Sequence, residues 1–311
     1  MRKIILFVFI CLFALFIVNN PLTSNYVSGL RYEAVMKQRD VLYKDIENNA
    51  QNYYIAPMDA KIDRVWKAIP ALNGLEVDIE ASYKKMKADG QFNKEKLVFK
   101  QLKPNILLSD LPPTPIYKGH PDKEMVSFLI NVAWGNEFLV DMLSILKKYN
   151  VHASFFLEGR WVQNNPELAK MIIDAGHEVG NHSYTHPNME KISAYQAREE
   201  IQKTNKVIQA ISDKPILWFA PPSGSYRDEI VQIAAEEKLG TVLWTVDTVD
   251  WKKPTPEQLL HRVMSKVHNG AMILMHPTDS TAKSLEQLII QLHKKNLQIR
   301  TVSELLSPER P

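Results

Sequence analysis

The sequence predicts an α/β protein whose parallel sheet closes into a barrel, preceded by smaller N-terminal segments. From residue 125 onward, seven short apolar runs alternate with six amphipathic segments, a pattern typical of parallel strands joined by helices. Right-handed crossovers close such a series most simply as a barrel. The chain has 311 residues, 45% of them hydrophobic and 23% charged, which indicates one large globular domain and something smaller.

Residues 1–24 are expected to form a signal peptide or a membrane anchor. Arg2 and Lys3 precede an unbroken apolar or small run at residues 4–18, as in secretory targeting segments. The run is shorter than the ~20 residues that usually span a bilayer, but no Ala-x-Ala cleavage site follows it, so both alternatives stay open. In either case we expect the rest of the chain outside the cytoplasmic membrane, in the cell envelope.

The only cysteine, Cys11, lies inside this apolar run. The body of the chain is therefore expected to have neither disulfides nor thiol chemistry. The formal net charge is +3, from 38 basic and 35 acidic residues. Because the basic residues do not cluster, we expect no nucleic-acid-binding surface.

The segments before the barrel are expected to have three different characters. Residues 25–52 mix charged and amide side chains without a clear apolar face, which is typical of a stalk or a marginal helix. Residues 53–104 predict a small α+β module. Its helices are expected at 60–69 and 79–87 and its strands at 74–78 and 96–100.

Val65, Trp66 and Ile69 fall on one side of the first of these helices, so we expect Trp66 in the core of the module. Residues 105–124 follow as a linker. Prolines at 112, 113 and 115 stiffen it toward an extended conformation.

The barrel domain is expected at residues 125–307. Its strands are predicted at 126–133, 153–157, 178–182, 216–220, 242–246, 271–275 and 298–302. Its helices are predicted at 138–149, 165–175, 194–210, 227–238, 255–267 and 280–295. Catalytic residues of such folds lie at the carboxyl ends of the strands, and polar clusters of this chain fall there.

His182 and His186 are candidates for holding a metal ion. They follow a short strand-like run at a spacing of four, and one turn of helix there would aim both imidazoles at a common point. The chain has nine histidines, so the spacing also arises by chance. A solvated helix face is the alternative interpretation.

Five motifs at predicted strand ends give the sequence a wider resemblance. They are NVAWG at 131–135, HSYTH at 182–186, FAPPSG at 219–224, DTVDW at 247–251 and LMH at 274–276. In order and spacing they resemble the polysaccharide deacetylases, carbohydrate esterase family 4, over residues 125–307. The resemblance implies a distorted (β/α)7 barrel and removal of N-acetyl groups from glycans with zinc or a similar divalent ion.

Four residues receive chemical roles by this resemblance. His182 and His186 take the two histidine positions of the metal site. His276 takes the general acid that protonates the departing amine, and Asp250 orients that imidazole. Hydrolysis of an amide needs such a set of groups. The carbonyl requires a Lewis acid, the attacking water requires a base, and the leaving nitrogen requires a proton. A buried hydrogen-bonded pair that braces two strand ends is the alternative for His276 and Asp250.

The substrate groove is assigned by the same resemblance. Trp251 forms its wall and Leu274 lines the pocket for the acetyl methyl group. Pro221 and Pro222 shape the loop beside it.

The sequence departs from the family pattern at three important positions. Ala133 stands where the family has the catalytic base, Trp134 where it has the third metal ligand, and Ala220 where it has an arginine. Loss of a positioned base alone costs a factor of about 10² to 10⁴ in rate. We therefore expect weak or absent metal binding and little or no activity. Glu137 is a possible substitute ligand or base, although a solvated carboxylate at a helix start is the simpler interpretation.

Three functions are compatible with this sequence. The first is a cell-envelope protein with a degenerate deacetylase site that binds N-acetylated cell-wall polysaccharide such as peptidoglycan. The second is an active N-deacetylase with an atypical site. The third is a membrane-tethered scaffold in which residues 53–104 dock another protein. Residues 62–70 and 131–137 also resemble a branch of the family from endospore-forming bacteria, which suggests a role in sporulation.

Overall fold

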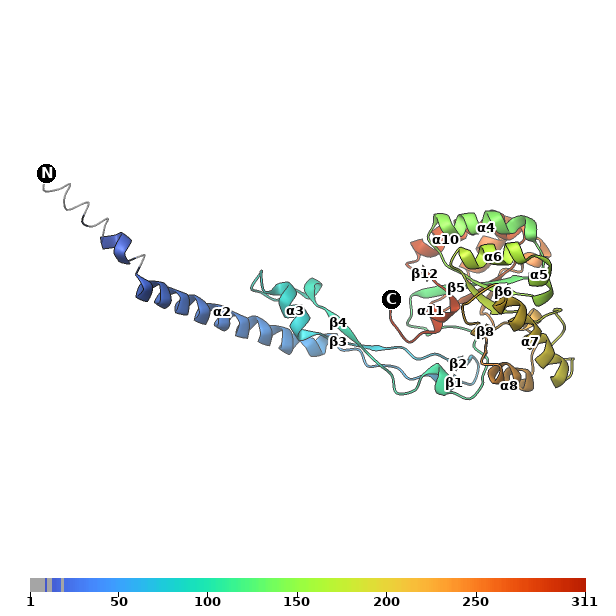
Figure 1. Ribbon diagram of the computed structural model, residues 1–311, viewed down its shortest axis with the longest axis horizontal. Coiled ribbons are helices and arrows are strands. Elements are labelled where there is room, and N and C mark those ends of the chain that lie inside the picture. Colours follow the sequence, from blue (N-terminus) through green and yellow to red (C-terminus); the bar gives the residue numbers. More distant parts are fainter. Residues whose placement is uncertain (1–8, 10–12, 18–19) are drawn as a thin grey trace. The chain divides into compact units, whose positions relative to one another are not determined.

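A computed structural model describes residue 9, residues 13–17 and residues 20–311, with side chains outside 31–40 (Figure 1). The chain forms two compact units. The smaller comprises Met1–Ala56 and Gly74–Leu102, and the larger Pro57–Asn73 and Lys103–Pro311. Residues 57–73 therefore pack with the larger unit, and not within the single module expected at residues 53–104.

The smaller unit contains one long helix and a compact α+β part. The elements are α2 (Pro21–Ala50), α3 (Ile79–Met86), β3 (Gly74–Val77) and β4 (Phe99–Leu102), with short 3-10 turns at Gln51–Tyr53 and Lys94–Lys96. Strands β3 and β4 pair antiparallel. Leu42 and Ile46 of α2 share a buried cluster with Met86 of α3. The expected strand at 74–78 and helix at 79–87 are confirmed, whereas the strand expected at 96–100 starts at Phe99.

The helix expected at residues 60–69 is wrong. This stretch forms the antiparallel hairpin of β1 (Lys61–Asp63) and β2 (Lys67–Ile69) in the larger unit. The Asp63 carboxylate accepts the amides of Val65 and Trp66, both at 2.8 Å, and this side-chain turn competes with a helix. Trp66 is 41% exposed, so its predicted core position is also wrong.

The proline-rich segment expected as a linker packs into the larger unit. Ile116 is buried and forms bridges to Ala68 of β2 and to Val242. A short 3-10 turn at Leu108–Asp110 precedes it. The segment therefore contributes to the packing of the larger unit.

The larger unit is a parallel barrel that is open on one side. Eight strands form its sheet, in the order β10-β11-β5-β6-β7-β8-β9 with β12 paired to β5. They are β5 (Met125–Val132), β6 (Ser154–Leu157), β7 (Glu178–Asn181), β8 (Trp218–Phe219), β9 (Gly240–Thr241), β10 (Val246–Asp247), β11 (Met272–Met275) and β12 (Gln298–Ile299). Within the described chain β9 and β10 do not pair with each other, so the opening lies between them. The predicted parallel α/β barrel is confirmed.

Helices pack around the outside of this sheet (Figure 1). They are α4 (Asn136–Lys148), α5 (Gly159–Asn164), α6 (Pro166–Asp174), α7 (Ala194–Gln209), α8 (Asp228–Glu236), α9 (Pro256–Met264) and α10 (Asp279–Lys294). The short helix α11 (Val302–Leu306) instead belongs to a separate buried cluster with Leu129 and Phe156. Every residue of β5 is buried, which explains why its sequence is apolar except for Ser127 and Asn131. The largest buried cluster joins the strands to the inner faces of the helices.

Three elements differ from the prediction. Most of the strand expected at 242–246 is irregular: β9 ends before it at Thr241, and β10 begins only at Val246. The strand expected at 298–302 ends at Ile299, because Thr301 caps α11 with its side chain. Helix α5 precedes the helix expected at 165–175 and was not predicted.

No helix in the described parts of the chain is both long and apolar enough to cross a membrane. Residues 1–8, 10–12 and 18–19, Cys11 among them, lie outside the described residues. The targeting segment therefore stays a prediction.

Candidate functional site

The predicted site residues gather at the carboxyl ends of the barrel strands. Two hollows of about 680 and 730 Å³ lie there, and both are lined by Trp134 and Glu137. His186 lines the first hollow, and Asp250 and Trp251 line the second. Residues from the first, second and fourth motifs thus line two hollows that share Trp134 and Glu137, and we call the two hollows together the groove.

The two histidines of the second motif lie together, but on a turn and not on the expected helix. Ser183 and His186 have left-handed backbone conformations, with φ of 61° and 56°. The Asn181 side chain accepts the Ser183 amide at 2.8 Å, which favours a turn directly after β7. The imidazole centroids of His182 and His186 are 5.0 Å apart with the ring planes at 69°.

His182 is held as a neutral imidazole. Its ring is fully buried, and Nδ1 lies 2.7 Å from the carbonyl oxygen of Ala220. Because a carbonyl only accepts, Nδ1 carries the proton and Nε2 keeps a free lone pair. Burial is the main cause that lowers the pKa of His182 to about 3, and a charged His186 nearby would lower it further. Burial also lowers the pKa of His186.

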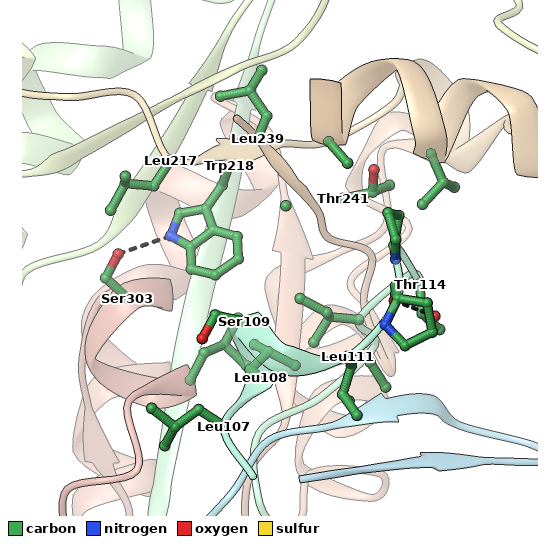
Figure 2. A pocket seen from close by; sticks show the side chains of 18 of the residues that line it. Leu107, Leu108, Ser109, Leu111, Thr114, Leu217, Trp218, Leu239, Thr241 and Ser303 are labelled. Carbon is green, nitrogen blue, oxygen red and sulfur yellow. Dashed lines mark hydrogen bonds between the residues drawn. The ribbon is translucent and has the colours of Figure 1, made fainter. Parts of the chain in front are cut away.

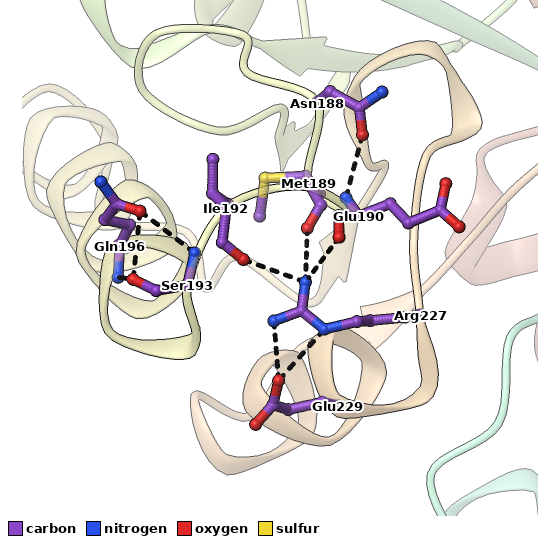
Figure 3. Close-up of polar contacts among 8 residues, drawn as sticks. All are labelled: Asn188, Met189, Glu190, Ile192, Ser193, Gln196, Arg227 and Glu229. Carbon is purple, nitrogen blue, oxygen red and sulfur yellow. Dashed lines mark hydrogen bonds and ion pairs between the residues drawn. The ribbon is translucent and has the colours of Figure 1, made fainter.

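Two residues outside the predicted set position the loop that carries these histidines. Glu200 of α7 accepts the amides of Tyr184 and Thr185 at 2.8 and 2.7 Å. Arg227 Nη1 donates to the carbonyls of Met189, Glu190 and Ile192, each at 3.0 Å, while its other nitrogens pair with Glu229 (Figure 3). The loop is therefore tied to both α7 and the start of α8.

Trp134 follows β5 and covers His276. The two rings are stacked, with centroids 5.2 Å apart and planes at 15°, and the indole is 44% exposed. Gly135 then turns the chain into α4 with a φ of 85°. A Cβ at residue 135 would lie 1.9 Å from the carbonyl oxygen of Pro277, so the close approach of this turn to the segment after His276 requires glycine.

His276 and Asp250 form a buried pair. The Asp250 carboxylate accepts His276 Nδ1 at 2.8 Å and the His276 amide at 2.6 Å. The Thr281 hydroxyl donates to it at 2.7 Å. Burial acts to raise the pKa of Asp250, but the hydrogen bonds from His276 and Thr281 outweigh it and hold that pKa below its ordinary value. The imidazole is thereby fixed in one orientation.

The third motif supplies backbone atoms and packing to the site. Ala220 is fully buried; its amide donates to the Asn181 carbonyl at 2.9 Å and its own carbonyl faces His182. Pro221 and Pro222 are buried as well. A short 3-10 turn at Pro222–Gly224 follows. Ala220 thus orients the His182 ring through its backbone, without the side-chain charge of an arginine.

The groove residues of the last two motifs have opposite exposure. Trp251 is 53% exposed, and Lys252 Nζ lies 4.9 Å from the centroid of its ring. Leu274 of β11 is buried. The structure therefore places Trp251 at the surface and Leu274 in the interior.

The side chains present do not form the three-ligand metal site that the resemblance implies. In the described residues no group of three or more His, Cys, Asp or Glu side chains is arranged to hold a metal ion. His182 and His186 approach each other, but the third position is an indole, which has no lone pair for a cation. Glu137 lies exposed in the first turn of α4.

Comparisons with known proteins agree with this geometry. Residues 118–242 match the family model described as polysaccharide deacetylase. The crystal structure of BA3943, a CE4-family pseudoenzyme from Bacillus anthracis, is 53% identical, with a TM-score of 0.84 over 87% of this chain and 96% of that one.

The chain belongs to the polysaccharide deacetylase family.

Two further relatives of this family are informative. The uncharacterized protein YlxY of Bacillus subtilis is 52% identical over 98% of this chain and 96% of its own length. A peptidoglycan-N-acetylglucosamine deacetylase of Bacillus cereus is 29% identical over 62% of this chain and 72% of its own length. Deacetylases of the family are generally metal-dependent. The family predicted from the five motifs is confirmed.

Sequence reasoning missed the residues that hold the site in place. Thr281, Glu200 and Arg227 all come from helices around the barrel. A hydroxyl in the first turn after His276 was a usable signal for Thr281, because the helix that follows a strand end points its first turn at the site. The residues before Arg227 and Glu200 carry no comparable pattern.

Proposed function

We propose that this chain is a pseudoenzyme of the polysaccharide deacetylase family that binds N-acetylated cell-wall glycan without removing its acetyl groups. The observation that carries the proposal is the stack of Trp134 on His276, at 5.2 Å between ring centroids. An indole occupies the position of a metal-binding carboxylate and covers the imidazole that would protonate the leaving amine.

The remaining polar residues cannot replace what is missing. Ala133 has no group that accepts a proton, and the loss of a positioned base costs about 10² to 10⁴ in rate. The pair of His276 and Asp250 persists as a buried brace between β11 and the turn after β10. These contacts support a site that keeps its structure without catalysing deacetylation.

Glycan binding is supported by the exposed aromatic surface of the groove. Trp134 and Trp251 both line the hollow of about 730 Å³, and sugar rings have apolar faces that pack on such indoles. Lys253 and Asp279 line the same hollow and offer hydrogen bonds to hydroxyl and amide groups. The relatives named as peptidoglycan deacetylases support an N-acetylated glycan as ligand.

A location outside the cytoplasmic membrane follows in this proposal from the expected targeting segment and from the nature of the ligand. The suggested role in sporulation stays a prediction from the resemblance.

Calorimetric titration with N-acetylglucosamine oligomers, together with an acetate-release assay, tests the proposal. We expect saturable binding, no acetate release, and at least a tenfold loss of affinity in Trp134→Ala and Trp251→Ala. Trp66→Ala is the matched control, because Trp66 is also exposed in the larger unit but lies outside the groove. Robust acetate release would instead support the active-deacetylase alternative, and unchanged affinity in both groove variants would refute glycan binding at this site.

A further inference from the structure

The hairpin of β1 and β2 and the segment beside it expose a group of apolar side chains. Val65 at the hairpin tip is 69% exposed and Trp66 41%. Ile62, Ile106 and Leu107 are also exposed. The Ala60 amide donates to the Ile106 carbonyl at 2.9 Å, so the second segment runs alongside the hairpin. We call residues 61–67, 106–108 and 118 the basal face.

The hairpin tip has a defined conformation. The Asp63 carboxylate accepts the amides of Val65 and Trp66 at 2.8 Å each. Lys118 Nζ lies 5.1 Å from the centroid of the Trp66 ring. A group of large apolar side chains held outward in this way is unusual for a surface that only meets water, and it indicates a contact surface.

Basic side chains outnumber acidic ones around these apolar residues. Besides Asp63, the acids are Asp59 and Asp110, whose carboxylates accept the amides of Ile106 and Leu107. Lys61, Arg64 and Lys67 belong to the hairpin, and Lys118 stands over Trp66. Asp63 is the only acid between residues 61 and 67, and its carboxylate is engaged by the tip amides. Tryptophan and aliphatic side chains within a basic rim are typical of proteins that dock on anionic membranes.

An apolar cavity adjoins the same face. Its volume is about 740 Å³, and Leu107 and Leu108 of the basal face line it together with Leu111, Leu217 and Trp218 (Figure 2). The Trp218 Nε1 donates to the Ser303 hydroxyl at 2.8 Å, so the indole presents hydrocarbon to the cavity. The cavity is large enough for part of an acyl chain.

The basal side of the barrel is opposite to the candidate site. Trp218 and Gly240, which line the cavity, are the first residues of β8 and β9. The site residues follow the last residues of β5, β7 and β11. In a parallel barrel these positions lie at opposite ends.

We propose that the basal face docks on the surface of an anionic phospholipid bilayer, with Val65 and Trp66 entering the headgroup region. The glycan groove then points away from the membrane. This contact is independent of the N-terminal targeting segment and of glycan binding.

A fluorescent label at the hairpin tip tests the proposal in the full chain. Val65→Cys in a Cys11→Ser background carries an environment-sensitive label, and Tyr195→Cys carries it at the exposed start of α7 as the matched control. With phosphatidylglycerol vesicles we expect the emission at residue 65 to shift to the blue and to be quenched by spin-labelled lipid. The label at residue 195 is expected to stay in water.

The charge dependence provides a second measurement. Lys61→Gln and Lys67→Gln are each expected to raise the half-maximal lipid concentration ~5-fold. Lys191→Gln changes an exposed residue of the loop between β7 and α7 and leaves this concentration unchanged. A label at residue 65 that stays in water, or that responds equally to neutral phosphatidylcholine, would overturn the proposal. A response to soluble polyglutamate without one to vesicles would also overturn it and indicate an acidic protein partner.

Discussion

Replacing the groove indole by a carboxylate should create a metal site. The structure supplies two of the three ligands, since the rings of His182 and His186 are 5.0 Å apart. His182 has its Nδ1 proton engaged by Ala220 and a pKa of about 3, so no proton competes with a metal at neutral pH. We expect Trp134→Asp to bind about one zinc per chain after dialysis, where the parent chain retains far less.

Adding the base should then restore chemistry. Ala133→Asp in the same chain is expected to raise acetate release from N-acetylglucosamine oligomers by a factor of about 10² to 10⁴ over Trp134→Asp alone, equivalent to ~3–5 kcal/mol in the barrier. A mutant of the related BA3943 pseudoenzyme is described as having restored enzymatic activity. Ala220 is fully buried in this chain, so we expect the Ala220→Arg variant to fold well only when residue 133 is acidic.

Zinc content by mass spectrometry and acetate release measure the two steps separately. His182→Ala in the Trp134→Asp background is the control and should lose the zinc. If Trp134→Asp binds no more zinc than the parent chain, the two imidazoles are not arranged as metal ligands and the reasoning fails.

Three further predictions concern stability. Burial lowers the pKa of His177 to about 4, below its value near 6.5 in the unfolded chain. Between these two pH values the unfolded chain binds more protons than the folded chain. The free energy of unfolding therefore falls as the pH is lowered through this window, by up to ~3 kcal/mol in total. Urea unfolding at pH 7 and pH 5 should show this loss, and His177→Asn should reduce it. Asp250→Asn disturbs a buried carboxylate with three donors and should cost about 1–3 kcal/mol in the free energy of unfolding. Arg227→Met removes the donor to three carbonyls (Figure 3), and hydrogen–deuterium exchange should become faster at residues 188–192.

The first two of these predictions have matched controls. His293→Asn and Asp279→Asn change exposed residues, and both should shift the unfolding free energy by less than ~0.5 kcal/mol. An unchanged pH dependence in His177→Asn, or an Asp250→Asn chain as stable as the parent, would contradict the burial arguments. For Arg227→Met, exchange that increases equally across the whole barrel would indicate global destabilisation and not local release of the loop.

The barrel could be predicted because its signals are local. Strands β5 and β11 are buried on both faces; β11 appears as an uninterrupted apolar run and β5 as one broken only by Ser127 and Asn131. The break between β9 and β10 could not be predicted, because residues 242–246 are apolar except for Thr245, although the backbone leaves the sheet between Thr241 and Val246. An apolar run in the sequence therefore indicates that a segment is buried, but it does not indicate which strand the segment pairs with.

The hairpin shows where periodicity misleads. The residues at helical spacing are Ile62, Val65, Trp66 and Ile69. The first three are exposed on β1 and the turn after it, and only Ile69 of β2 is buried. The decisive interactions are the two hydrogen bonds that the Asp63 carboxylate accepts from the backbone. A pattern of hydrophobic residues contains no information on such bonds. The turn of helix expected at His182 and His186 was wrong for the same reason, because the Asn181 side chain accepts the Ser183 amide and favours a left-handed turn after β7.

The replaced positions could be identified from sequence only because the remaining motifs fixed their place. Ala133 and Trp134 are unremarkable residues by type. Neither the stacking of Trp134 on His276 nor the role of Thr281 follows from composition or spacing, because both depend on how α4, α10 and two loops meet in space.

The order of segments in the larger unit affects how the protein can be made and cut. Its first part, Pro57–Asn73, is synthesised before Gly74–Leu102, and the chain returns at Lys103. The Asn73 amide donates to the Pro308 carbonyl at 2.7 Å, so the first and last segments of this unit are in contact. A recombinant fragment that begins after residue 73 therefore loses a piece of the barrel unit, and a nascent chain cannot close this contact until residue 308 has left the ribosome.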